Sequence, residues 1–323
     1  MLFYGPPMNR CRFLLLFSLV GLTTPALACM NDYVPNVVAI ERSRTVLEQL
    51  QKHVLKEPWE TRRDRLRKEL AAGGDYRVKN DLATALAHTG DAAEAVTLLE
   101  QIEAEKPGLY VTAANLGTAY ELAGNNEKAL EWIRKGIERN ARAHQGTEWL
   151  HVRILEAKLA LRDDPMWLES NSIVGQRKKY GGVEVYAVGN RGEKLSLEQI
   201  KGALVYQLHE RLQFVNPPDA IVGELLLDLG TLLGHEPSGL GGAYDVFKLA
   251  AEYFGDLPNV DSLRLNAHTH LRGAAMGQRT SVERFYKSLP FVIGLGCLLS
   301  AAVVSMMRRT QRKRSNQEAR GAA

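Results

Sequence analysis

The sequence has few cysteines, three in 323 residues. Cys11 lies in an apolar leader, Cys29 lies at the end of that leader, and Cys297 lies within a second apolar run. These positions exclude a disulfide framework of the kind that holds small secreted domains together. The folded part must therefore be held together by an apolar core.

The bulk of the chain also lacks a surplus of basic charge. The formal charge of +4 depends on the last sixteen residues, which carry six basic side chains and one acidic one, Glu318. A protein that binds nucleic acid needs a basic stripe on its folded part, and a terminal cluster does not supply one. The sequence therefore predicts no nucleic-acid partner.

Patterns typical of enzymes and metal sites are missing as well. The sequence contains no nucleophile elbow and no phosphate-binding loop. His268 and His270 are two positions apart, so on a helix their side chains point to different sides, and no third ligand follows at a suitable spacing. The sequence predicts no catalytic residue, no metal and no cofactor.

The N-terminus has the features of a secretory signal peptide. A basic stretch precedes the apolar run Phe13–Leu22, which is too short to cross a bilayer core of about 30 Å. Small residues at Ala26 and Ala28 predict cleavage after Ala28, so residues 1–28 form the signal peptide. Cleavage would make Cys29 the first residue and allow lipidation, although lipoproteins more usually carry Leu where Ala26 stands; otherwise Cys29 is an incidental thiol.

A transmembrane helix is predicted near the C-terminus. Residues 288–307 carry no charge, and at a helical rise of about 1.5 Å per residue they span about 30 Å. The basic tail, residues 308–323, follows at once and is expected to stay in the cytoplasm by the positive-inside rule. Residues 29–287 would then lie outside the cytoplasm, in the periplasm of a bacterial cell, held by a single pass. The alternative for residues 288–307 is a buried core helix.

The chain repeats itself with a period of 34 residues, over residues 76–109 and 110–143. Each copy has an apolar–small pair, a large residue, a glycine and then a small and a large apolar residue: Leu82-Ala83, Leu86, Gly90, Ala95 and Leu99, then Leu116-Gly117, Tyr120, Gly124, Ala129 and Ile133. This pattern resembles the tetratricopeptide repeat family. The resemblance implies one pair of antiparallel helices for each copy, brought close together by the small residues.

The turn inside each pair has its own signature. Gly90-Asp91 and Gly124-Asn125 are expected to end the first helix and begin the second, with Asp91 and Glu94 forming a capping box. A degenerate third copy runs from Asp228 to Leu233, with Ala243, Phe247 and Ala250 on its second helix.

The predicted fold is therefore all-α, a helical-hairpin superhelix with a divergent insert and one C-terminal transmembrane helix. Two amphipathic helices over residues 40–56 and 59–72 are expected to pair as a cap, and a helix opened by Ser196 and Gln199 is expected in the insert. The predicted parts are a cap (29–75), repeats (76–162), the insert with a short hairpin and a helix (163–217), degenerate repeat helices with a linker (218–287), the span (288–307) and the tail (308–323).

The resemblance also implies a binding groove. In this family the first helix of each pair lines a concave face, and the matching polar residues here are Asn80, Asp81, Thr84, Asn115, Thr118, Glu224, Asp228 and Thr231. They predict that another protein or peptide is held partly by side-chain hydrogen bonds. Alternatively, these residues only cap and solvate their helices. Of the residues with which some members clamp a terminal carboxylate, only Asn115 is present, so that mode is not expected.

These features predict a membrane-anchored, non-catalytic scaffold that mediates protein–protein interaction on the exported side. The alternative is an envelope hydrolase or a metal-dependent enzyme that uses the insert. Glu224 and Asp228 would serve such an enzyme, because residues four apart share one face of a helix.

Overall fold

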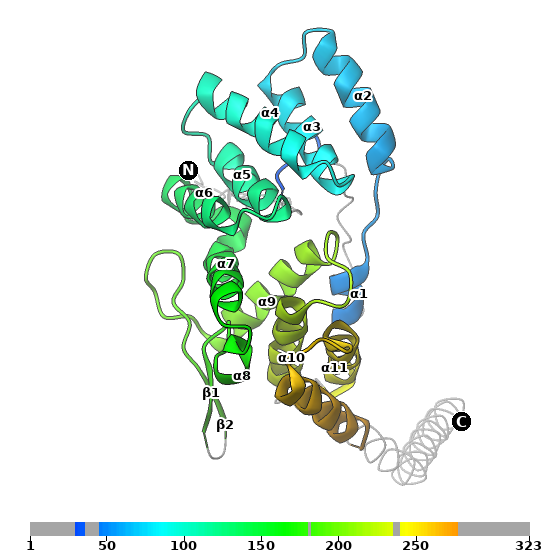
Figure 1. Ribbon diagram of the computed structural model, residues 1–323, viewed down its shortest axis with the longest axis vertical. Coiled ribbons are helices and arrows are strands. Elements are labelled where there is room, and N and C mark those ends of the chain that lie inside the picture. The colour runs from blue at the N-terminus through cyan, green and yellow to red at the C-terminus, as the bar shows by residue number, and fades with distance from the viewer. Residues whose placement is uncertain (1–29, 36–44, 180–181, 235–239, 277–323) are drawn as a thin grey trace, which may run out of the picture.

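The computed structural model describes residues 30–35, 45–179, 182–234 and 240–276. These residues are mostly helical, as predicted, with one short hairpin. The molecule is elongated, with the repeat helices at one end and the helices that follow the insert at the other (Figure 1). The predicted leader, membrane span and basic tail lie outside the described residues. In the described part, no helix is both long enough and apolar enough to cross a membrane.

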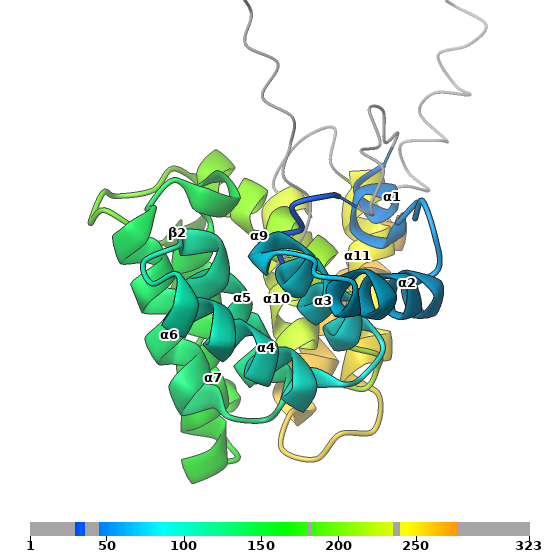
Figure 2. The ribbon, with the colours of Figure 1, turned by 90° about the horizontal axis from the view of Figure 1, so that it is seen from above.

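The repeat region is a stack of helices in which each packs against the next in the chain. These helices are α2 (Trp59–Ala71), α3 (Tyr76–His88), α4 (Ala92–Glu105), α5 (Tyr110–Leu122), α6 (Asn126–Arg139) and α7 (Glu148–Asp163). Seen from above, they fan around one side of the molecule (Figure 2). The two predicted repeats correspond to the pairs α3–α4 and α5–α6.

The turns within these pairs have the predicted form. Gly90 and Gly124 have φ angles of +88° and +82°, which side chains disfavour. The N–H of Asp91 donates to the carbonyl of Leu86 at 2.8 Å, and the N–H of Asn125 donates to that of Tyr120 at 2.9 Å. These bonds reach back five residues and close a glycine-based helix end.

The predicted capping box at Asp91 is wrong. Asp91 stands at the helix start, but its side chain makes no capping hydrogen bond. It accepts instead from the hydroxyl of Thr89 at 3.4 Å and pairs with Arg63 at 3.7 Å. In the second repeat Asn125 does cap its helix, by accepting from the N–H of Lys128 at 3.1 Å.

Small residues bring the paired helices together, as the repeat pattern predicts. A Cβ added to Gly117 would lie 2.3 Å from Cδ1 of Ile133, so only glycine fits there. The same relation recurs between α10 (Ala220–Gly234) and α11 (Leu240–Phe254), where a Cβ on Gly230 would lie 2.6 Å from Cε1 of Phe247. The third copy is therefore a close-packed helix pair like the first two.

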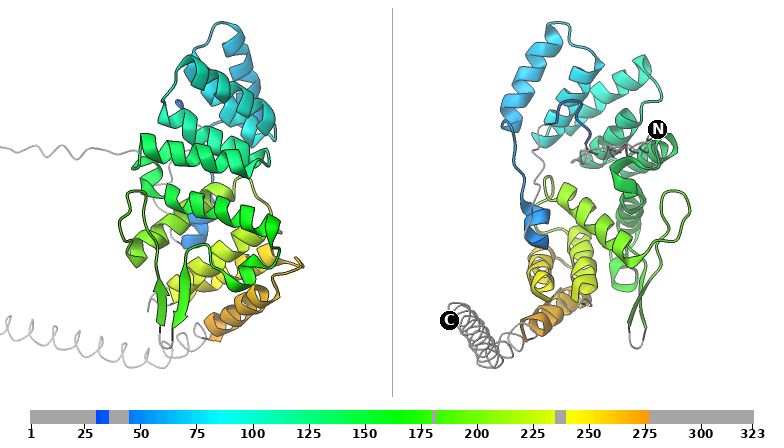
Figure 3. Two further views of the ribbon diagram at one scale, coloured as in Figure 1. Left: turned by 60° about the vertical axis from the view of Figure 1, so that its left-hand side comes forward. Right: turned by 180° about the vertical axis from the view of Figure 1, so that it is seen from behind.

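The third pair nevertheless belongs to a different core. One apolar cluster holds the helices of the first two repeats, and a second joins α7, α10 and α11 to α9 (Leu197–Arg211) and to the helical residues 261–276. Figure 3 shows this second group beside and below the repeat stack.

The predicted helical pair at the N-terminus does not form. The first helix, α1 (Val46–Gln51), ends five residues earlier than predicted and packs against α9 and α11, not against α2. Leu50 is fully buried in the second apolar cluster. The apolar stripe was predicted correctly, but it covers a face formed by residues much later in the chain.

The insert contains the short hairpin and the helix that its sequence predicts. Strand β1 (Gln176–Lys179) pairs antiparallel with β2 (Gly182–Val185), with Gln176 opposite Val185. The capping box of Ser196 and Gln199 at the start of α9 is confirmed. Between α6 and these elements lie a 3₁₀ turn, η1 (Ala143–Gly146), and the short helix α8 (Trp167–Ser170).

Candidate functional site

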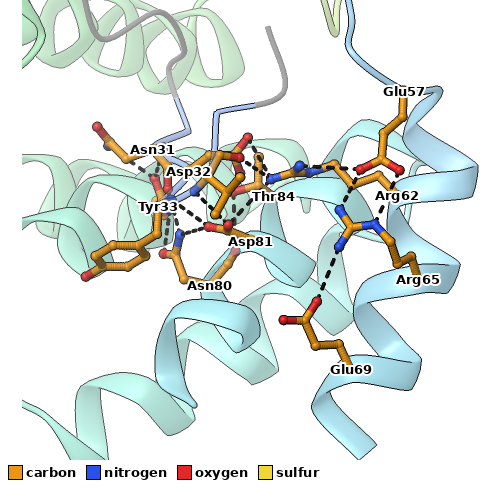
Figure 4. Close-up of polar contacts among 12 residues, drawn as sticks. Asn31, Asp32, Tyr33, Glu57, Arg62, Arg65, Glu69, Asn80, Asp81 and Thr84 are labelled. Carbon is orange, nitrogen blue, oxygen red and sulfur yellow. Dashed lines mark hydrogen bonds and ion pairs between the residues drawn. The ribbon is translucent and has the colours of Figure 1, made fainter. Parts of the chain in front are cut away.

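A non-helical segment, residues 30–35, lies against the first helices of both repeats (Figure 4). The N–H of Asn31 donates to Oδ1 of Asn115 at 2.6 Å. The carbonyl of Asn31 accepts from Nδ2 of Asn80 at 2.6 Å and from Nδ2 of Asn115 at 3.0 Å. Two asparagines, one from α3 and one from α5, thus bind both main-chain polar groups of Asn31.

Asp81 holds the next residues of this segment. Its Oδ1 accepts from the N–H of Tyr33 at 2.6 Å, and its Oδ2 accepts from the N–H of Val34 at 2.9 Å. Burial raises the pKa of Asp81, while these two hydrogen bonds lower it in part. A buried carboxylate that accepts from two N–H groups can bind the main chain of a peptide.

Arg62 of α2 completes this side of the site. Its guanidinium donates to the carbonyl of Val34 at 2.5 Å and lies 3.4 Å from the carboxylate of Asp32 and 3.5 Å from that of Asp81. The Arg62 side chain is 2% exposed, so these carboxylates supply the opposite charge that a buried guanidinium requires. Helices α2, α3 and α5 therefore converge on five consecutive residues, 30–34.

The side chain of Asn31 reaches a buried histidine. Its Oδ1 lies 3.0 Å from Nε2 of His144, whose Nδ1 contacts the carboxylate of Glu148. Both partners of the ring are acceptors, so the imidazolium, which donates from both nitrogens, fits this geometry best. Burial lowers the pKa of His144, but the charge and the hydrogen bond of Glu148, with the charge of Glu210, together outweigh burial and leave that pKa raised.

A buried charge network extends from His144 into α7, α5 and α9. His151 lies between two carboxylates, 2.6 Å from Glu121 and 3.5 Å from Glu148. Glu121 also pairs with Arg211 at 2.6 Å and with Lys158 at 2.7 Å. Burial would raise the pKa of Glu121, but these cations hold it well below its usual range. The network thus connects the groove that holds residues 30–34, formed by α2, α3 and α5, with the second apolar cluster.

Five of the eight predicted groove residues lie on α3 and α5, and the other three lie on α10. Asn80, Asp81 and Asn115 bind residues 31–34 directly. Thr84 and Thr118 are buried on the same helices, with hydroxyls that donate to the carbonyls of Asn80 at 3.3 Å and Ala114 at 3.4 Å. Asn80, Asp81 and Asn115 therefore face residues 31–34, and the binding of a partner by these five residues stays a prediction.

The remaining three predicted residues lie on α10, in the second apolar cluster. Glu224 and Asp228 are 4% and 5% exposed, and the hydroxyl of Thr231 donates to the carbonyl of Leu227 at 2.8 Å. Burial raises the pKa of Asp228 to about 8, while a hydrogen bond to Ser172 acts the other way. Because α10 packs in the other core, the third copy does not extend the surface that α3 and α5 present to residues 30–34.

The site residues that the sequence did not predict include Asn31, Arg62 and His144. Asn31 follows the predicted leader, and Arg62 lies among other charges on α2, so neither stands out. Glu148 and His151 are three residues apart on α7 and share one face of that helix, but His144 lies before α7, in the η1 turn, with a φ of +48°. The sequence therefore contains no helical pattern that points to His144.

Within the described residues, no group of three or more His, Cys, Asp or Glu side chains could hold a metal ion. A cavity of about 510 Å³ lies between the η1 turn and α9, and one of about 400 Å³ borders Tyr33 and Val34. Neither is lined by Glu224 or Asp228.

Comparison with known families identifies a tetratricopeptide repeat at residues 77–101. No curated protein matches the chain. The matched range includes Asn80, Asp81 and Thr84. Repeats of this family generally mediate protein–protein interaction, so a scaffold role agrees with the fold of this region.

Proposed function

We propose that this chain is a non-catalytic scaffold that binds a peptide segment of another protein in the groove formed by α2, α3 and α5. One observation carries the proposal. Side chains of these helices bind the main chain of a non-helical segment through Asn115, Asn80, Asp81 and Arg62. Recognition of main-chain groups gives affinity for a peptide whatever its side chains, and pockets beside it give specificity.

The chemistry of the groove favours recognition over catalysis. Amide side chains donate and accept without changing charge, and the carboxylate of Asp81 is engaged by two N–H groups. A general base needs instead a proton on a substrate within reach. The groove thus presents binding groups.

The binding proposal is tested by crosslinking in intact membranes followed by capture of the chain. Wild type is compared with an Asn80→Ala, Asn115→Ala variant that is shown to be folded by circular dichroism. The matched control is Arg134→Ala on α6, a residue whose side chain is 53% exposed and pairs with Glu156 at the surface. A specific partner lost only from the groove variant supports the proposal, whereas identical partners for all three proteins contradict it.

The same proposal places the groove on the exported side of the cell membrane. The support is in the sequence: a leader over residues 1–28, an uncharged run over residues 288–307 and a basic tail over residues 308–323. Alkaline phosphatase is active only outside the cytoplasm, so fusions after residues 287 and 323 test this topology. Activity in the first fusion and none in the second is expected, and the reverse pattern would contradict it.

A further inference from the structure

We infer that residues 30–34 are a resident ligand of the groove, and that the protein partner displaces them with a segment of the same chemistry: apolar, asparagine, aspartate, aromatic. This inference rests on the proposed function, because it assumes that the groove binds peptides. It adds the identity of the competing occupant and the side chains that a partner must carry.

The first specific position is Asn31. Its Oδ1 lies 3.0 Å from Nε2 of His144, and its Nδ2 donates to Oδ1 of Asn115 at 3.3 Å. One side chain thus accepts at one end and donates at the other. A carboxylate has no donor for Asn115, and alanine has neither group. This position therefore selects a primary amide.

The second specific position is Asp32. Its carboxylate lies 3.4 Å from the guanidinium of Arg62, and the two side chains are 7% and 2% exposed. Removing one partner of a buried ion pair is far more costly than removing an exposed one. Asp81 and Glu57 also face Arg62, at 3.5 and 3.6 Å, so the ligand supplies one of three carboxylates around this cation.

Apolar and aromatic positions flank this polar pair. Met30 is fully buried in the apolar cluster of the repeats. The ring of Tyr33 makes an edge-to-face contact with Tyr76, with centroids 5.6 Å apart, and Arg77 lies 5.9 Å from its centroid. Aromatic pairs of this geometry attract one another beyond the effect of burying their surface. The groove therefore contacts four consecutive side chains, those of residues 30–33.

Tethering makes the resident segment a strong competitor. It belongs to the same chain as the groove, and an intramolecular ligand can reach an effective concentration on the order of millimolar. A free peptide with identical contacts must compete against that concentration. Weakening the resident segment is therefore expected to expose the groove.

The test uses the full-length chain in detergent and a fluorescent peptide, Met-Asn-Asp-Tyr-Val-Pro. In the release variant, Asn31→Ala with Tyr33→Ala, the groove is intact and the resident ligand is weakened. Fluorescence anisotropy is expected to show binding at least tenfold tighter than to wild type. A peptide with aspartate in place of its asparagine is expected to bind at least tenfold more weakly. Lys52→Ala, an exposed site outside the groove, is the matched control and is expected to behave as wild type.

Equal binding by wild type and the release variant overturns the inference, and so does equal binding of the two peptides. If the release variant does not stay folded, wild type is titrated with excess peptide. Saturable binding that Asn115→Ala abolishes then supports the inference, and its absence overturns it. If the crosslinked partner depends on the groove but the peptide does not compete with it, the proposed function stands and this inference fails. If the peptide competes for the groove but no partner is captured, the proposed cellular function fails instead.

Discussion

The carboxylate of Asp81 accepts a hydrogen bond from the N–H of Tyr33 at 2.6 Å, across 48 residues of sequence. The same carboxylate accepts from Val34 at 2.9 Å and lies 3.5 Å from the guanidinium of Arg62. One side chain thus joins α2, α3 and the segment before α1. The stability of this end of the molecule should depend on it.

We expect Asp81→Ala to lower the free energy of unfolding by about 3 kcal/mol, because it leaves a buried guanidinium with fewer counter-charges and two N–H groups without their acceptor. Asp81→Asn keeps one acceptor oxygen and should cost less, about 1 kcal/mol. Urea denaturation followed by circular dichroism measures both. Asp64→Ala, at a side chain 58% exposed on α2, is the control and should stay within about 0.5 kcal/mol of wild type. An Asp81→Ala loss as small as the control's contradicts this account.

The groove shows which parts of the site can be predicted from the sequence. Asn80, Asp81 and Asn115 could be predicted, because a repeat pattern fixes which face of a helix a position occupies. Their occupant could not, because the contact between Asn31 and Asn115 joins residues 84 apart and leaves no periodic trace. The same limit applies to α1 and α10. Their apolar stripes can be recognised in the sequence. The apolar cluster that each stripe joins, however, depends on how helices far apart in the sequence pack together.

The close approach of α5 and α6 gives a prediction with opposite signs at two glycines. Gly117→Ala would place a Cβ 2.3 Å from Cδ1 and 3.2 Å from the main-chain N of Ile133, and we expect a loss of about 1–3 kcal/mol from overpacking. Gly136→Ala meets its nearest neighbour, Ala114, at 3.6 Å, an ordinary contact. It should gain up to about 1 kcal/mol from helix propensity. Thermal unfolding of both variants tests this, and a loss at both positions contradicts it.

The burial of His88 predicts that the folded protein loses stability at acid pH. Its ring is stacked between Trp59 and Phe214, with centroids 3.8 and 4.2 Å away, and burial lowers its pKa to about 3. Below the ordinary histidine pKa of about 6.5, the His88 ring binds a proton in the unfolded chain but stays neutral in the folded chain. The free energy of unfolding therefore falls with falling pH. We expect His88→Phe, which keeps the stacking, to remove about 1–2 kcal/mol of the loss between pH 7 and pH 5.

His53 adds to the same effect, because burial and then the neighbouring His209, 4.3 Å away between ring centroids, lower its pKa to about 4. The His88→Phe variant should therefore retain part of the acid-side slope. A double variant, His53→Gln with His88→Phe, should retain less. Unfolding curves at pH 7, 6 and 5 measure the slope for each protein, and three identical slopes would rule out these two histidines as its source.

His144 and His151 predict the opposite slope on the alkaline side. Burial lowers the pKa of each ring, but the carboxylates beside them outweigh burial and leave both pKa values raised: Glu148 and then Glu210 for His144, and Glu121 and then Glu148 for His151. The folded chain therefore keeps protons that the unfolded chain loses above pH 6.5. Their stabilisation is fully present below about pH 6.5 and is lost as pH rises through the raised values.

The acid-side and alkaline-side contributions come from different histidines, so each can be removed separately. His144→Gln keeps a donor for the side chain of Asn31 but cannot titrate, so melting temperatures between pH 6 and pH 9 should fall less steeply for it than for wild type. The acid-side slope should remain, because His88 is untouched. If the melting temperature of His144→Gln falls between pH 6 and pH 9 as steeply as that of wild type, the titrating group is not His144 and lies elsewhere in the network.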